Sequence, residues 1–170
     1  MHQGSMTRLR LTLRVALVAF AVALPVSADA PISGPDRQYE NFDGQNKVIS
    51  DRFTKLAWDR PSDPYPATMS FGDANAYCRA QGSMRLPSLK ELLTLIDEEP
   101  HKEYDTVKKA NVPRYIDRAA FPKTPAEEFW TSSMQSPTKA WTVDFGSGTT
   151  AGANIDDDKR RVRCVEFIGL

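Results

Sequence analysis

The chain has 170 residues, of which 22 are basic and 22 are acidic, so its formal net charge at pH 7 is zero. This length predicts one domain with short appendages, and a hydrophobic fraction of 41% predicts a packed core rather than disorder. A neutral chain that lacks a basic stripe gives no reason to expect a nucleic-acid partner.

The first 28 residues predict a secretory signal peptide. Three arginines precede an apolar run from Val15 to Leu24, and small residues follow up to Ala28; the arginines are Arg8, Arg10 and Arg14. The small residues favour cleavage after Ala28. The apolar run is too short for a membrane span, which needs roughly 20 residues. We therefore expect no membrane span after cleavage, and export to the periplasm or the medium of a bacterium. An uncleaved membrane anchor is the alternative. Residues 1–5 are interpreted as an alternative start or a vector-derived remnant.

Cleavage would remove three arginines and no acid, which leaves 19 basic and 22 acidic residues. The two cysteines, Cys78 and Cys164, are interpreted as one disulfide, because an exported chain meets an oxidising compartment. The alternative, a catalytic thiol, would need a neighbouring base, and the only histidine beyond the signal peptide is His101. Chain entropy gives such a disulfide an upper stabilisation of roughly 4–5 kcal/mol.

The N-terminal half predicts an arm, two strands and two helices. Residues 29–46, rich in Pro, Gly and Asp, predict a flexible arm, and short strands are expected at 48–49 and 56–58. Two pairs of residues have the spacing of helix N-terminal caps, Ser70 with Asp73 and Ser88 with Glu91. We expect the first helix to end at Gly82 and the second at Pro100.

The C-terminal half predicts several short strands after a long irregular segment. Residues 97–105 are interpreted as a solvated charged run and residues 106–128 as irregular. In KAWTVDF the apolar side chains alternate with polar ones and are expected to share one buried face: Trp141, Val143 and Phe145. RRVRCVEFI predicts the closing strand. Strands, two helices and further strands, in that order, indicate an α+β fold.

Seven segments occur in an order that resembles one known family: KLAW, ANAYC, MRLPSLKELLTLID, AAFPKT, FWTSS, AWTVDF and VRCVE. The set, between residues 47 and 166, resembles the bacterial Lcl C-terminal domain family, named after the Legionella collagen-like adhesin, whose members are largely of unknown function. The resemblance implies a C-type-lectin-like domain over residues 47–170. That fold has two helices, a small antiparallel sheet, a long irregular loop region and a disulfide from the first helix to the last strand. Cys78 and Cys164 occupy those two places.

Calcium chemistry is not expected. The tripeptides of calcium-dependent lectins, EPN or QPD with WND, are absent. The three acids Asp156, Asp157 and Asp158 could hold a cation, but basic residues at 159–161 follow at once and favour compensated surface charge in a turn. We therefore expect no metal and no cofactor.

Catalytic groups do not form a recognisable set either. A glycosidase pair, Glu91 with Asp97 or Glu127 with Glu128, would have to flank a cleft, and Glu91 is already accounted for by helix capping. The formylglycine-generating enzymes share a lectin-like fold and need a reactive thiol pair, whereas both thiols here are assigned to the disulfide. No catalytic residue is expected.

Candidate binding residues lie mainly in residues 129–150. Trp58, Trp130 and Trp141 could stack on sugar rings, although their apolar strands favour the core. The side chains most able to reach a ligand are Trp130, Ser132, Ser133, Thr142 and Asp144. We expect an exported, non-enzymatic recognition or adhesion module for extracellular polysaccharide, a glycosaminoglycan-like polymer or a protein. The alternative is a structural or accessory envelope protein that acts through protein partners.

Overall fold

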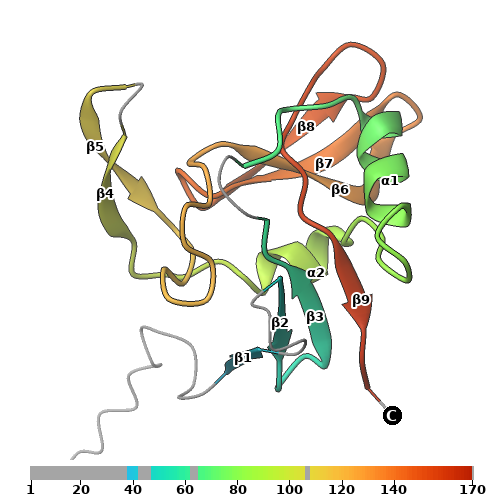
Figure 1. The fold of residues 1–170 in the computed structure, drawn as a ribbon. Helices are drawn as coiled ribbons and strands as arrows, with labels where there is room; N and C mark the ends of the chain where they lie inside the picture. The colour runs from blue at the N-terminus through green and yellow to red at the C-terminus, as the bar shows by residue number, and fades with distance from the viewer. Residues whose placement is uncertain (1–37, 42–46, 62–64, 106–107, 170) are drawn as a thin grey trace, which may run out of the picture. The chain divides into compact units, whose positions relative to one another are not determined.

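Short strands dominate the computed structural model, which describes residues 38–41, 47–61, 65–105 and 108–169. The strands pair antiparallel in three small sheets, and two short helices complete the described part of the chain (Figure 1). The described residues all belong to one compact unit, residues 31–170. The predicted signal peptide lies outside them.

The first sheet has four strands in the order β1-β2-β3-β9. Their bounds are β1 (Tyr39–Asn41), β2 (Val48–Asp51), β3 (Leu56–Asp59) and β9 (Val165–Phe167). Because β9 pairs with β3, the two ends of the domain meet in this sheet. Strand β1 falls in the segment that was expected to be a flexible arm; apart from Gln38, the rest of that arm lies outside the described residues.

The second sheet is a meander of β6 (Glu128–Ser136), β7 (Lys139–Asp144) and β8 (Thr149–Asn154). Both of its faces are packed over part of their length. One face contributes Trp130, Ala140 and Ala153 to a buried cluster that contains the two cysteines. Phe129 and Val143, which point the other way, belong to a second cluster with residues of the four-stranded sheet. The strands predicted at FWTSS and KAWTVDF are therefore confirmed, the second as far as Asp144.

The two helices begin where the capping pattern predicts. Helix α1 (Phe71–Arg79) follows Ser70, and helix α2 (Leu89–Leu93) follows Ser88, whose side chain accepts a hydrogen bond from Glu91 N while the Glu91 carboxylate accepts one from Ser88 N. This reciprocal arrangement satisfies donors that a helix start leaves free. Helix α2 ends well before Pro100. Neither described helix is long and apolar enough to cross a membrane.

The third sheet is a hairpin of β4 (His101–Asp105) and β5 (Ala110–Arg114). The charged run and the start of the irregular segment had been expected in its place. The polar side chains of β4 alternate between exposed and half-buried positions, which is the pattern of a strand with one solvated face. In Figure 1 the hairpin lies apart from the other two sheets.

The expectation of an α+β, C-type-lectin-like fold is wrong. The described chain is β-rich, with three small antiparallel sheets instead of one and with only two short helices. Two local causes account for the difference. Helix α2 stops at Leu93, since Thr94 forms its C-cap, and the long loop region that a lectin would have contains the β4–β5 hairpin.

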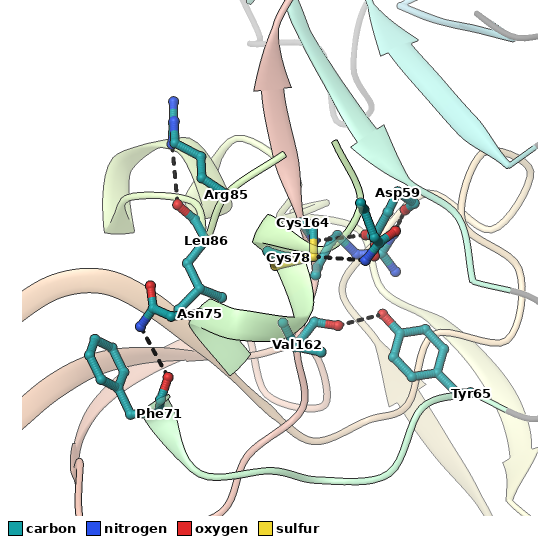
Figure 2. The surroundings of a disulfide bond; sticks show 11 residues. Asp59, Tyr65, Phe71, Asn75, Cys78, Arg85, Leu86, Val162 and Cys164 are labelled. Carbon is teal, nitrogen blue, oxygen red and sulfur yellow. Dashed lines mark hydrogen bonds between the residues drawn. A yellow bond between two sulfur atoms is a disulfide. The ribbon is translucent and has the colours of Figure 1, made fainter. Parts of the chain in front are cut away.

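The predicted disulfide is confirmed. Cys78, in the last turn of α1, is bonded to Cys164, which directly precedes β9, and the two Cα atoms are 5.4 Å apart (Figure 2). Both cysteines are fully buried. The bond therefore joins α1 to the four-stranded sheet across 86 positions of sequence.

Candidate functional site

Two of the three tryptophans belong to the core, as expected. Trp58 and Trp130 have no exposed surface. The indole of Trp130 donates a hydrogen bond to the carbonyl of Met69 at 2.9 Å and meets the Phe71 ring edge-on, with centroids 5.5 Å apart. The only polar group of the Trp130 side chain is thus already paired inside the fold.

Trp141 departs from the expectation of a shared buried face. Val143 and Phe145 are fully buried, but Trp141 is partly exposed. Its cross-strand partner on β8 is Gly152, which has no side chain to cover the indole. The prediction that residues alternate along this strand is confirmed, whereas the prediction that Trp141 is buried is wrong.

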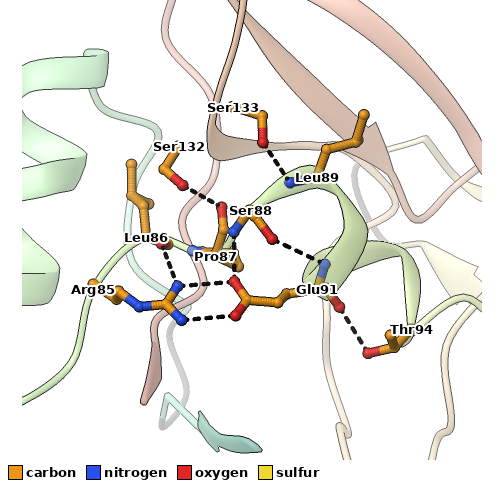
Figure 3. A network of polar contacts seen from close by, with 9 residues as sticks. All are labelled: Arg85, Leu86, Pro87, Ser88, Leu89, Glu91, Thr94, Ser132 and Ser133. Atoms are coloured by element: carbon orange, nitrogen blue, oxygen red, sulfur yellow. Dashed lines mark hydrogen bonds and ion pairs between the residues drawn. The ribbon is translucent and has the colours of Figure 1, made fainter. Parts of the chain in front are cut away.

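The serines of β6 fasten the start of α2 to the sheet (Figure 3). Ser132 donates through its hydroxyl to the carbonyl of Pro87 at 3.2 Å, and Ser133 Oγ accepts from Leu89 N at 2.9 Å. In the loop that leads to α2, Arg85 forms two hydrogen bonds with the Glu91 carboxylate, at 2.8 and 2.7 Å. These bonds hold the pKa of Glu91 down at about 2.

Thr142 and Asp144, the other candidate binding residues, also have structural contacts. Thr142 is fully buried, and its hydroxyl lies 3.1 Å from a Glu128 oxygen and 3.2 Å from the carbonyl of Ala151. Asp144 Oδ1 accepts from Gly146 N at 2.6 Å and so shapes the β7–β8 turn. Of the five candidate residues, Trp130 and Thr142 are cross-strand partners, but both are fully buried. The role of the five in binding stays a prediction.

The acidic residues considered for catalysis are used in ion pairs. Glu127 pairs with Arg161 at 2.9 Å and Glu128 with Arg160 at 2.6 Å, which joins β6 to the segment before Val162. In the 156–158 turn, Asp158 Oδ2 accepts from Asn154 N at 2.7 Å. Among the described residues no group of three or more His, Cys, Asp or Glu side chains could hold a metal ion.

A buried polar centre beside the disulfide was missed by the sequence reading. Arg163 is 1% exposed, lies 4.6 Å from the Phe121 ring centroid, and donates to the carbonyl of Asp59 at 2.7 Å and to Thr124 Oγ1 at 2.8 Å. The Asp59 carboxylate accepts from Cys164 N at 2.8 Å. Burial raises the pKa of Asp59 to about 6, although the Arg163 charge opposes the rise. This centre joins β3 to the cysteine segment (Figure 2).

The β4–β5 hairpin has two chemically different faces. Lys102 and Tyr104 are exposed and alternate on β4, and their cross-strand partners are Pro113 and Asn111. Two more exposed lysines, Lys108 and Lys109, follow in the turn that leads to β5. We define the hairpin face by five residues: Lys102, Tyr104, Lys108, Lys109 and Asn111.

The acids of the hairpin lie on its opposite face. Glu103 and Asp105 alternate with Lys102 and Tyr104, and they face the guanidinium of Arg114 at 3.9 and 3.6 Å. Arg114 is only 7% exposed. The acids are therefore compensated on their own side, while none of the three lysines forms an ion pair among the residues that the structure describes.

Two backbone features bear on the hairpin face. Lys109 has a φ of 49°, in the left-handed region that Gly or Asn occupies at lower cost. The hairpin base is fixed to the core, because Tyr115 N donates to the Phe145 carbonyl at 2.8 Å and Asp97 N donates to the Tyr115 carbonyl at 3.1 Å. The face thus combines an exposed aromatic ring, an amide and three lysines without an ion pair to any described residue, on an anchored support.

Comparison with protein-family models finds the family that the order of motifs along the chain resembles. The model of the Lcl C-terminal domain matches residues 47–166, which is most of the chain. No curated protein and no solved structure matches the chain. The C-type-lectin-like relationship that the resemblance implied has no support from a solved structure.

Proposed function

Because the chain belongs to the Lcl C-terminal domain family, we propose that it is an exported, non-enzymatic, adhesin-like recognition module for an extracellular anionic polymer. The observation that carries the proposal is the hairpin face, where Lys102 and Tyr104 are exposed on the side of β4 opposite Glu103 and Asp105, and the exposed Lys108 and Lys109 follow in the turn. Charge complementarity favours an anionic partner there.

The chemistry of such binding needs no calcium. An ammonium group attracts carboxylate or sulfate groups directly, whereas calcium-dependent recognition needs a cage of oxygen ligands. Each exposed ion pair contributes only about 0.2–1 kcal/mol. A polymer meets several lysines at once, so small contributions add, and the aromatic ring of Tyr104 adds contact area at low entropic cost.

Export is the second part of the proposal. The amino-terminal sequence with its arginines, apolar run and small residues supports a signal peptide. The disulfide agrees with this, because such bonds persist in oxidising compartments. Mass measurement of the protein recovered from a periplasmic fraction or the medium tests it: a chain that begins at Asp29 supports export with cleavage after Ala28, and an intact chain in the membrane contradicts it.

Binding of the purified chain to immobilised polymers tests the recognition proposal. We expect retention on polygalacturonate and on a sulfated polysaccharide, but not on neutral dextran, in the presence of a calcium chelator. Retention should fall as salt rises from about 50 to 500 mM, because exposed charges are screened beyond a Debye length of a few ångströms at the higher salt. Equal retention on dextran, or none on any anionic polymer, contradicts the proposal.

A second candidate is an accessory envelope protein that acts through a protein partner. Strand β8 is an edge strand of its sheet among the described residues, and exposed edge strands can pair with a strand of another protein. Specific envelope proteins recovered with the chain, together with no binding to any polymer, would favour this candidate.

A further inference from the structure

Trp141 differs from the other two tryptophans in that it reaches solvent. Trp58 and Trp130 have no exposed surface, while Trp141 is partly exposed in the middle of β7. Its indole N–H donates no hydrogen bond among the described residues, and it is not one of the buried polar atoms that lack a partner. The N–H is therefore accessible to solvent. One large aromatic ring with a free donor is therefore presented at the surface of the β6–β8 sheet.

A glycine and the Gln135 side chain lie beside Trp141. Gly152 lies directly opposite on β8, and cross-strand partners point to the same face. A Cβ atom at Gly152 would overlap the side chain of Gln135, so the Gln135 amide lies over the position that the glycine leaves open.

Lys139 adds a positive charge to this face. It precedes Trp141 by two residues on β7, so its side chain points to the same side of the sheet. Lys139 is exposed and forms no ion pair in the part of the chain that the structure describes. We define the Trp141 platform as Trp141, Gln135 and Lys139.

We infer that the Trp141 platform binds a pyranose ring that carries an acidic group. The C–H groups on one face of a pyranose are apolar and stack on the indole ring, whose polar edge stays wet. The Gln135 amide and the indole N–H bind sugar hydroxyls, and the Lys139 ammonium binds the carboxylate or sulfate.

This inference deepens the proposed function, since it identifies the anionic polymer as a saccharide. The inference rests on the proposed function in one respect, namely that the ligand is an anionic polymer. The platform and the hairpin face share no residue, so a measurement can affect one and leave the other.

Two anionic probes separate sugar recognition from charge recognition. We would titrate the nitrogen-15-labelled chain with a galacturonate hexamer and, separately, with a polyphosphate of similar charge, and follow the three indole N–H signals by NMR. The Trp141 signal is assigned with Trp141→Leu. We expect the hexamer to shift the Trp141 signal in a saturable manner and polyphosphate to leave it in place.

Affinity measurements provide a second readout. Trp141→Leu should weaken hexamer binding about tenfold, which corresponds to the loss of one aromatic contact, and should leave polyphosphate binding unchanged. The matched control is Phe53→Leu, which removes an aromatic ring that is 60% exposed in the β2–β3 turn and should leave both affinities unchanged. The dispersion of the backbone NMR signals of the variant shows that it is folded.

The outcomes distinguish the two proposals. If the hairpin signals respond to both probes and Trp141 responds to neither, the platform is wrong and the proposed function stands. If the hexamer shifts Trp141 while the hairpin signals stay in place, the platform stands and the assignment of recognition to the hairpin face is wrong.

Discussion

The β6–β8 sheet and the β4–β5 hairpin use their polar side chains in opposite ways. In the sheet, Ser132, Ser133 and Thr142 form hydrogen bonds to neighbouring segments. In the hairpin, Lys102 and Tyr104 are exposed, and the acids on the reverse face are compensated by Arg114. The comparison teaches that Ser and Thr beside tryptophan marked a packed sheet here, while the exposed face that we propose for an anionic polymer lies in a segment first interpreted as a solvated charged run.

The largest expected effect separates the packed scaffold from the hairpin. Replacing both cysteines (Cys78→Ser with Cys164→Ser) should lower the free energy of unfolding by about 4 kcal/mol, because the closed loop is long. Urea unfolding followed by tryptophan fluorescence measures the change. A loss below about 1 kcal/mol would mean that the disulfide contributes little to the scaffold.

The next effect is a pH dependence from Asp59. The pKa of Asp59 is about 6 in the folded chain, against a value of 3.8 for an exposed Asp, which represents the unfolded chain. Between pH 3.8 and 6 the folded chain therefore binds the proton more strongly than the unfolded chain. The free energy of unfolding should therefore fall as pH rises from about 4 to 6, by about 3 kcal/mol. Asp59→Asn should abolish this decrease when unfolding is measured across that range. A variant with the wild-type slope would assign the dependence to other groups.

A smaller effect tests the N-terminal cap of α2. Ser88→Ala removes the acceptor for Glu91 N and should cost about 1 kcal/mol of unfolding free energy. Thr68→Ala, at an exposed position outside the helices, is the control and should change stability by less than about 0.5 kcal/mol. If both variants lose the same stability, the cap is not what holds the start of α2.

The smallest expected effect on stability comes from the hairpin face. The triple variant Lys102→Gln, Lys108→Gln, Lys109→Gln should change the free energy of unfolding by less than about 0.5 kcal/mol, since the three ammonium groups form no ion pair among the described residues. Chemical unfolding measures this. A loss above about 2 kcal/mol would show that the lysines belong to the scaffold and not to a free surface.

Local signals in the sequence predicted the parts of the fold that depend on near neighbours. The caps at Ser70 and Ser88 are readable because both partners lie within three residues, and the export argument predicted the pairing of Cys78 with Cys164. The alternation in KAWTVDF predicted β7, but the exposure of Trp141 depends on Gly152 across the sheet, which no local pattern reveals.

The hairpin and the buried polar centre depend on distant residues. Strand β5 contains Pro113 and a single β-branched residue, Val112, so its pairing with β4 gave only a weak sequence signal. Arg163 lies among the alternating residues of RRVRCVEFI, yet its burial requires partners from two distant segments, Asp59 in β3 and the pair Phe121 and Thr124. The strand predicted over RRVRCVEFI is only β9, and Arg163 precedes it. Such a residue could have been suspected only from a charged side chain between apolar residues of the sequence.

The affinity of the lysine triple variant for polygalacturonate tests the central claim most directly. Three exposed contacts at about 0.5 kcal/mol each correspond to roughly tenfold weaker binding. The matched control replaces three exposed lysines elsewhere (Lys47→Gln, Lys90→Gln, Lys159→Gln) and has the same net charge. The hairpin variant should bind about tenfold more weakly than the wild type at low salt, and the control should lose much less. Equal losses in the two variants would contradict recognition through the hairpin face.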